Sequence, residues 1–182
     1  ALFLIFCVIG FTFRTYSQPF LLLLLIPFSL TTVAWGHLVH GFPVNVISLL
    51  GVIALVGILV NDGLVLISKF NSNLRAGKSY DESLFGAGKE RFRAIFLTSI
   101  TTMAGLAPII FEKSFQAQLL KPMAISIAYG IGYATFLTLI LLPILLSLTN
   151  TFKLNFVWLR SGKKLDKREV EAPVIELKRE EK

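Results

Sequence analysis

Long apolar segments alternate with short polar ones along this sequence. The apolar segments lie at about residues 1–13, 19–40, 45–70, 94–111 and 122–149. A helix needs about 20 mostly apolar residues to cross a membrane, and all but the first segment approach or exceed that length. The pattern predicts an all-α integral membrane protein, a polytopic bundle of five transmembrane helices with the first truncated. Because the sequence is apolar from Ala1, without the basic region of a signal peptide, we expect it to begin inside a transmembrane helix.

The two polar regions have different patterns. Ser79 and Glu82 have the spacing of a capping box, which predicts that a helix begins there. Apolar residues then recur on one side of residues 79–92, which indicates either a helix lying in the membrane interface or a solvated loop helix. Residues 150–182 carry mixed charge, including Lys163, Lys164, Lys167, Arg168, Glu176, Glu180 and Glu181. We therefore expect a transmembrane domain at 1–149 and a charged cytoplasmic tail at 150–182, either disordered or a marginal helix on the membrane surface.

Composition supports a membrane location. Hydrophobic residues make up 54% of the chain and the mean hydropathy is +0.72, which is too apolar for a surface that faces water. The net charge of +7 comes from basic residues gathered between Lys69 and Arg93 and after Lys153. Basic residues favour cytoplasmic loops, so this distribution predicts a cytoplasmic C-terminus and lipid contacts rather than nucleic-acid binding. The sequence predicts no enzyme activity and no cofactor.

The most informative residue is Asp62, an acid inside the apolar segment 45–70. An ionisable side chain within a membrane costs several kcal/mol unless it faces water or the protein interior, so it marks a functional site by default. One interpretation is that Asp62 takes up and releases a proton, with Asn61 as a hydrogen-bond partner of the protonated acid. The other is that Asp62 keeps one protonation state and only holds helices together.

Hydroxyl residues share one face of the segment 94–111. Thr98, Thr101, Thr102 and Gly105 are spaced i, i+3, i+4 and i+7. Small and hydroxyl residues let helices approach closely, and a water-lined proton path is the alternative interpretation. In either case we expect the three threonines to face the helix that carries Asp62.

Trp35, His37 and His40 gather at the end of the segment 19–40. They indicate an aromatic belt at the membrane interface or, alternatively, a pair of proton-handling histidines.

Three stretches together resemble a known family. GILVNDGLVLISKFN and GKERFRAIFLTSITTMAGLAPIIFE look like the C-terminal transmembrane half of a resistance-nodulation-division (RND) efflux permease, and WGHLVHGFPVNVISLLGVIALVGILVND resembles its hydrophobe/amphiphile efflux branch. The resemblance implies a parent with twelve transmembrane helices, of which this chain supplies the end of the eighth and the ninth to twelfth. It also implies a proton-driven homotrimer in the bacterial inner membrane, working with a periplasmic adaptor and an outer-membrane channel.

The resemblance also assigns individual residues. Asn61 occupies the position of a family lysine that pairs with acids of the fourth helix, and Asp62 follows it. Thr98 matches a threonine close to the proton site, and Arg91, a candidate residue on the cytoplasmic side, matches a basic residue just before that helix. The family often has a proline where this chain has Ala94.

The leading hypothesis is that the chain is a fragment of a proton-driven efflux transporter. Alternatives are a non-transport membrane module, such as a sterol-sensing or protein-translocation auxiliary domain, and an inactive structural remnant. Drug, lipid, metal and dye export all stay open as substrate classes. Metal is the least expected, because no Cys/His/Asp/Glu cluster has ligand spacing.

Overall fold

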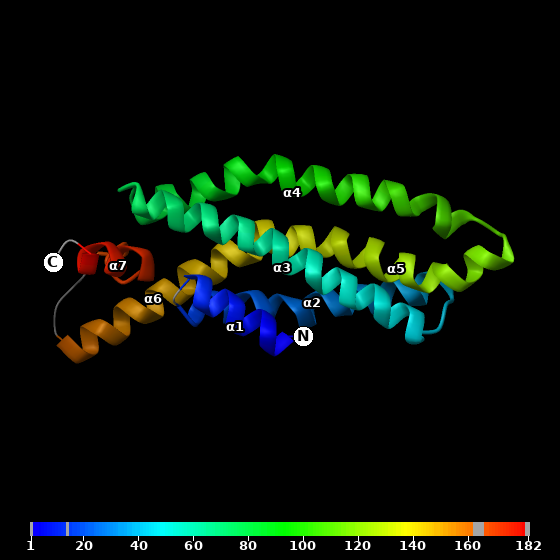
Figure 1. Cartoon of the computed structure of the whole chain (residues 1–182), viewed down its shortest axis with the longest axis horizontal. Helices are drawn as coiled ribbons and strands as arrows, with labels where there is room; N and C mark the ends of the chain where they lie inside the picture. Colours follow the sequence, from blue (N-terminus) through cyan, green and yellow to red (C-terminus); the bar gives the residue numbers. More distant parts are fainter. Residues whose placement is uncertain (1, 14, 162–165, 181–182) are drawn as a thin grey trace.

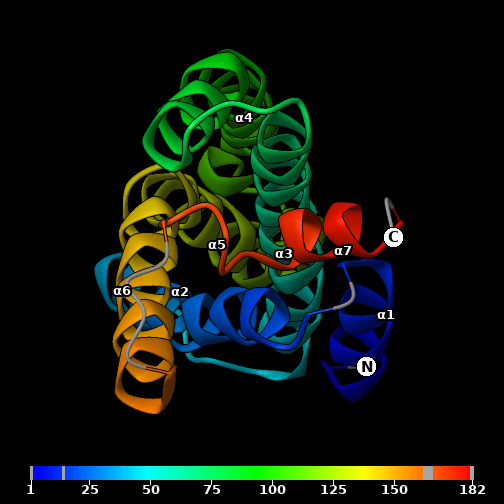
Figure 2. The same ribbon diagram turned by 90° about the vertical axis from the view of Figure 1, so that its left-hand side faces the viewer.

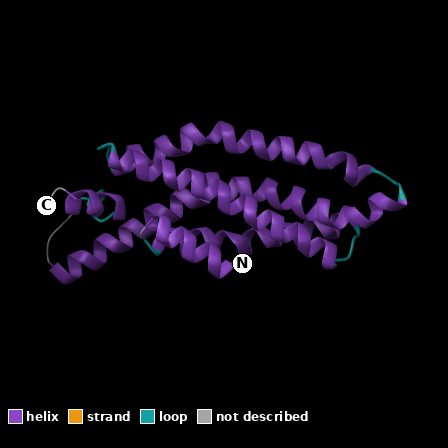
Figure 3. Ribbon diagram, in the orientation of Figure 1, coloured by secondary structure: helices purple, strands orange, loops and turns teal. Residues whose placement is uncertain are grey.

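The computed structural model describes residues 2–13, 15–161 and 166–180, and every regular element within them is helical (Figures 1 and 3). The elements are α1 Leu2–Phe13, α2 Ser17–His40, α3 Val46–Arg75, α4 Tyr80–Phe111, α5 Phe115–Phe136, the π turn η1 Leu137–Leu141, α6 Leu142–Ser161 and α7 Ala172–Glu180. The predicted all-α helical bundle is confirmed.

Four helices of the described chain are long and apolar enough to cross a membrane: Ser17–His40, Val46–Arg75, Tyr80–Phe111 and Phe115–Leu159. The first predicted segment forms α1, which has only 12 residues. The last predicted span, 122–149, lies within a helix of 45 residues, because α5, η1 and α6 follow one another without a break. At 1.5 Å per residue this helix is about 68 Å long, more than twice the thickness of a hydrocarbon core.

Helix α4 begins at the predicted capping box. The Ser79 hydroxyl accepts from the Glu82 N–H at 3.3 Å, and the Glu82 carboxylate accepts from the Ser79 N–H at 3.2 Å. These two bonds satisfy N–H groups that have no partner inside the helix. The helix then continues to Phe111, so the predicted segments 79–92 and 94–111 form one helix. The location of residues 79–92 in the membrane interface stays a prediction.

Helices α3 and α5 form the centre of the bundle, with α2 on one side and α4 on the other (Figure 2). Their contact is close at Gly51, where an added Cβ would lie 2.7 Å from the Met123 carbonyl oxygen and 2.8 Å from Ser126 Cβ. Gly130 lies one turn along from Ser126, and a Cβ added there would clash with the Leu55 side chain. Ser126, Gly130 and Ala134 recur every four residues along α5 and are buried, and the first two lie at this contact, as expected for helices that pack in a membrane.

A buried pair of amides joins the beginning of α2 to the end of α3. Gln18 Nε2 donates to Asn71 Oδ1 at 2.9 Å, and Asn71 Nδ2 donates to Gln18 Oε1 at 3.0 Å. Both side chains are buried. Each amide therefore has a donor and an acceptor satisfied by the other, which a polar group needs where water is excluded.

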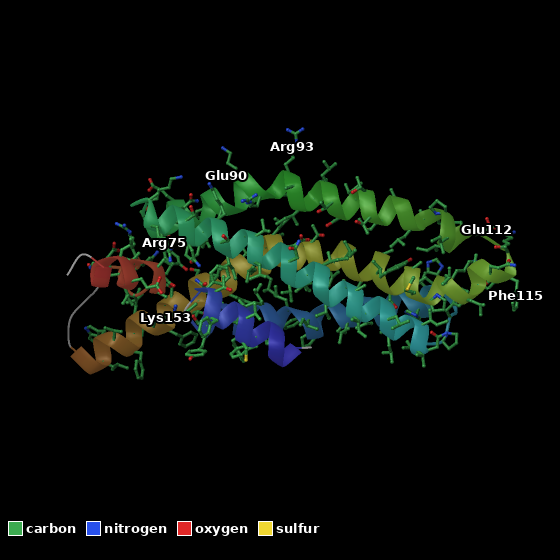
Figure 4. All side chains as sticks on the ribbon, viewed as in Figure 1. Arg75, Glu90, Arg93, Glu112, Phe115 and Lys153 are labelled. Carbon is green, nitrogen blue, oxygen red and sulfur yellow. The ribbon has the colours of Figure 1, made fainter. Side chains whose placement is uncertain are left out.

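The described part of the tail packs against the bundle. Glu171, which is 3% exposed, accepts from Asn150 Nδ2 at 2.7 Å and from Lys153 Nζ at 3.1 Å. Arg168 donates to the Leu74 carbonyl at the end of α3, at 3.1 Å, and Val174 joins the hydrophobic core. Figure 4 shows Arg75 and Lys153 at this end of the molecule, next to α7. Lys163, Lys164 and Glu181 lie outside the described residues, as does the side chain of Glu180.

We predict that Glu171→Ala destabilises the fold by about 1–3 kcal/mol, because it leaves the Asn150 amide and the Lys153 ammonium without their acceptor. Thermal unfolding of the detergent-solubilised protein measures the effect. Glu169→Ala is the matched control: Lys178 lies 2.6 Å from the Glu169 carboxylate and holds its pKa below the ordinary value, but both side chains are exposed. Exposed pairs contribute little, so equal losses in the two variants would contradict a structural role for Glu171.

Candidate functional site

Asp62 lies in a cavity of about 400 Å³ between α3, α4 and α5. Helix α3 supplies most of its wall, at positions spaced as one helical face; α4 supplies three hydroxyl side chains and α5 one apolar residue. The lining residues are Ala54, Gly57, Ile58, Asn61, Asp62, Thr98, Ser99, Thr102 and Ile131. The cavity therefore combines one carboxyl group with amide and hydroxyl groups inside an otherwise apolar bundle.

Two glycines of α3 close to Asp62 differ in the space around them. A Cβ added at Gly57 would meet no atom within 4 Å, so the absence of a side chain there keeps the cavity wide. A Cβ added at Gly63 would lie 2.2 Å from Leu22 Cδ2, so α2 approaches α3 closely directly after Asp62. Helix α3 is thus packed against α2 on one face and open to the cavity on another.

The carboxyl of Asp62 has neither a hydrogen bond nor an ion pair within the described part of the chain. Its side chain is half-buried, while the neighbouring Asn61 is exposed. None of the described lining residues is basic. A carboxyl in such a place is free to bind a proton, a water molecule or a group from another segment.

The threonine prediction is met for two residues of three. Thr98 and Thr102 line the cavity, one helical turn apart. The Thr101 side chain is exposed and outside the cavity, and its hydroxyl donates to the Leu97 or Thr98 carbonyl at 2.9 or 3.0 Å. Residues four apart lie above each other on a helix, whereas Thr101 is rotated by about 100° from Thr102.

Ser99 is a lining residue that the sequence did not single out. It is 3% exposed, and its hydroxyl forms a hydrogen bond with that of Thr135 on α5 and lies 2.9 Å from the Ile95 carbonyl oxygen. Thr135 is also buried, and its hydroxyl lies 2.9 Å from the Ile131 carbonyl oxygen. The only sequence signal for this pair is a hydroxyl residue within each apolar segment, which does not reveal that the two meet.

Arg91 does not reach the cavity. It lies on α4 about two turns before Thr98, is half-buried and is absent from the lining. The neighbouring Glu90 instead pairs with Lys69 of α3 at 2.7 Å, which joins α3 to α4. Any role of Arg91 on the cytoplasmic side stays a prediction.

The two histidines connect α2 to other helices, each through its own partner. His37 is buried, with Nε2 2.8 Å from the Ser48 hydroxyl of α3 and Nδ1 3.0 Å from the Val33 carbonyl. His40 Nε2 lies 3.1 Å from the Tyr129 hydroxyl of α5. Both positions are remote in sequence from the Asp62 cavity, and neither histidine lines it.

Comparisons with known proteins agree on the family. The model of the AcrB/AcrD/AcrF family matches residues 1–150, so most of the tail lies beyond the match. The chain is 29% identical to the swarming motility protein SwrC of Bacillus subtilis over 154 residues, covering 84% of this chain and 15% of that protein. It is 30% identical to the cobalt-zinc-cadmium resistance protein CzcA of Cupriavidus metallidurans over 150 residues, covering 82% and 14%.

A third relative is the multidrug resistance protein MdtC of Serratia proteamaculans, 26% identical over 163 residues, covering 89% of this chain and 16% of that protein. Among solved structures, a crystal structure of a heavy metal efflux pump superposes with a TM-score of 0.74 and 29% identity, covering 82% of this chain and 15% of the pump. The chain thus spans about one seventh of the length of the relatives it matches. The chain belongs to the AcrB/AcrD/AcrF family of RND efflux permeases.

Proposed function

We propose that this chain is part of the membrane machinery of a longer permease that exports a substrate across the bacterial inner membrane in exchange for protons. The observation that carries the proposal is the half-buried Asp62, which has no partner among the described residues, in a cavity lined with amide and hydroxyl groups. The family assignment supports export rather than enzymatic catalysis, because relatives are named for metal and multidrug resistance.

The proposed mechanism is a change in the hydration of Asp62. An ionised carboxylate needs water or hydrogen-bond donors, whereas a protonated carboxyl can be satisfied by a single acceptor. Asn61, Thr98 and Thr102 offer both kinds of group around the cavity. A conformational change that opens or closes the cavity to water alters the proton affinity of Asp62, and this couples proton movement to transport.

The remaining partners are proposed from the family resemblance. Asn61 occupies the position of the family lysine, so we infer that any charged partner of Asp62 comes from the N-terminal half of the permease. We also propose a homotrimer with a periplasmic adaptor and an outer-membrane channel. The substrate stays open, since relatives are named for cobalt, zinc and cadmium as well as for multidrug resistance. Within the described residues, no group of three or more His, Cys, Asp or Glu could hold a metal ion.

The orientation follows from basic residues at the two ends of the bundle. The half of the bundle that holds the α3–α4 turn carries Lys69, Arg75, Lys78, Lys89, Arg91 and Arg93, whereas the α4–α5 turn is flanked by Lys113 and Lys121. Figure 4 shows Arg75 at one end of the molecule and Glu112 and Phe115 at the other. We propose that the Arg75 end and the tail are cytoplasmic.

We predict that a cysteine at Ser114 reacts with an impermeant thiol reagent in intact cells and that a cysteine at Lys78 does not. Both native side chains are exposed in turns. The full-length permease is used with Cys7 replaced by serine and other cysteines removed. Permeabilised cells provide the control, because both cysteines should then react. If only the cysteine at position 78 reacts in intact cells, the orientation is the reverse of the one proposed.

We predict that Asp62→Asn lowers proton-coupled exchange by about tenfold or more, because asparagine keeps the shape of the side chain but cannot titrate. The full-length permease is reconstituted in vesicles with a trapped pH indicator, and Co²⁺, Zn²⁺ and ethidium are tested for their ability to drive proton movement. Asp62→Glu is the control, since it retains a titrating carboxyl and should keep measurable exchange. An Asp62→Asn permease with the parent's rate and pH dependence would show that Asp62 carries no proton.

A further inference from the structure

Ser99 and Thr135 form a hydroxyl pair at the wall of the Asp62 cavity. The pair links α4 to α5, and both side chains are buried. Ser99 itself lines the cavity, and so does Ile131, whose carbonyl lies within hydrogen-bond distance of the Thr135 hydroxyl. Through Ser99 the pair therefore lies at the wall of the space that holds Asp62.

The number of hydrogens in the pair is smaller than the number of its contacts. Each hydroxyl has one hydrogen to donate and can also accept. Three contacts are available: Ser99 with Thr135, Ser99 with the Ile95 carbonyl, and Thr135 with the Ile131 carbonyl. Two hydrogens cannot make three hydrogen bonds and also leave a hydrogen for the cavity. The pair must therefore adopt one of several alternative arrangements.

One arrangement suits a donor in the cavity. If a protonated carboxyl or a water molecule donates to Ser99, Ser99 donates to Thr135 and Thr135 donates to the Ile131 carbonyl. Every hydrogen then has an acceptor. The opposite arrangement suits an acceptor in the cavity, because Thr135 donates to Ser99 and Ser99 turns its hydrogen toward the cavity. Only hydroxyl rotations separate the two arrangements, and no covalent bond changes.

We propose that the Ser99–Thr135 pair is a positioning element for the proton that Asp62 binds, reversing the direction of its hydrogen bonds when Asp62 changes protonation state. The inference rests on the proposed function. Asp62 has no hydrogen bond within the described residues, so the pair reaches it through water, and a cavity of about 400 Å³ holds several water molecules of about 30 Å³ each. Because the pair joins two helices, its direction also links the state of Asp62 to the contact between α4 and α5.

Another hydroxyl on α5 lacks this arrangement. Ser126 is buried like Thr135, but its hydroxyl donates to the Pro122 carbonyl of its own helix at 2.9 Å. It has no hydroxyl partner on another helix within the described chain and does not line the cavity. Ser126 is therefore a matched control for the loss of a buried hydroxyl on the same helix.

The test is an infrared titration of the purified full-length permease, in which the carboxyl band of Asp62 is the one lost in Asp62→Asn. We expect Ser99→Ala and Thr135→Val each to move the titration midpoint by about 0.5–1 pH unit, because each removes one hydrogen bond of the pair. The double variant should show no more than either single change, since the two hydroxyls act as a unit. Thr135→Ser keeps the hydroxyl and should therefore have the same titration midpoint as the parent permease. Ser126→Ala should also leave the midpoint unchanged.

The outcomes separate this inference from the proposed function. The inference alone is overturned if the Asp62 band titrates in the parent and its midpoint is unmoved by Ser99→Ala and Thr135→Val. It is also overturned if the two changes move the midpoint additively. The absence of any titrating Asp62 band overturns both. Variants that do not fold are identified by their thermal unfolding, and Thr135→Ser and Ser126→Ala keep the test decisive because each removes little volume.

Discussion

Every polar group inside a membrane-spanning bundle needs a partner within the protein, and the arrangement of this chain depends on that constraint. Its backbone is satisfied by helices, and the threonines of α4 donate to carbonyls of their own helix. The amides of Gln18 and Asn71 satisfy each other, and His37 bonds to Ser48. Asp62 departs from this rule, because its carboxyl has no partner in the described residues, and so does the buried hydroxyl of Thr138. Of these two groups only the carboxyl is titratable, so the proposed proton exchange rests on Asp62.

The packing of α3 explains which of its faces is open to the cavity. Near Gly51 the helix lies so close to α5 that an added Cβ would meet the Met123 backbone. Six residues later, at Gly57, the same addition would meet nothing, and at Gly63 it would meet Leu22 of α2. Helix α3 is therefore closely packed on the faces toward α5 and α2, with Leu55 and Leu59 buried, and open on the face that carries Gly57 and Asp62. On that open face α4 contributes hydroxyl groups to the opposite wall of the cavity.

Sequence periodicity predicted the apolar parts of the long helices and the face that Thr98 and Thr102 share, but not the continuous helix Phe115–Leu159. The spacing of Thr98 and Thr102 placed both on one face, and the single acid identified the helix that they meet. The capping box at Ser79 marked the start of α4. The shared face of Thr98 and Thr102 and the start of α4 depend on local geometry, which the order of residues determines directly.

Contacts between distant segments were not predictable in the same way. Thr101 shares the threonine spacing but lies at the edge of the face, and the rotation of α4 against α3 and α5 leaves it outside the cavity. The meeting of Ser99 with Thr135 depends on the rotation of α4 against α5, which no spacing within one helix reports. The tail was expected to be disordered or marginally helical, yet a single buried acid, Glu171, joins it to α6. Its mixed charge gave no sign of which acid is buried.

The central claim is that Asp62 exchanges a proton when the permease binds or releases its substrate. The most direct measurement is the number of protons released by purified full-length permease in weakly buffered solution when Co²⁺, Zn²⁺ or ethidium is added. The account predicts that the parent permease releases protons with at least one of these compounds and that Asp62→Asn, binding the same compound, releases none. Equal proton release from the two proteins would contradict it.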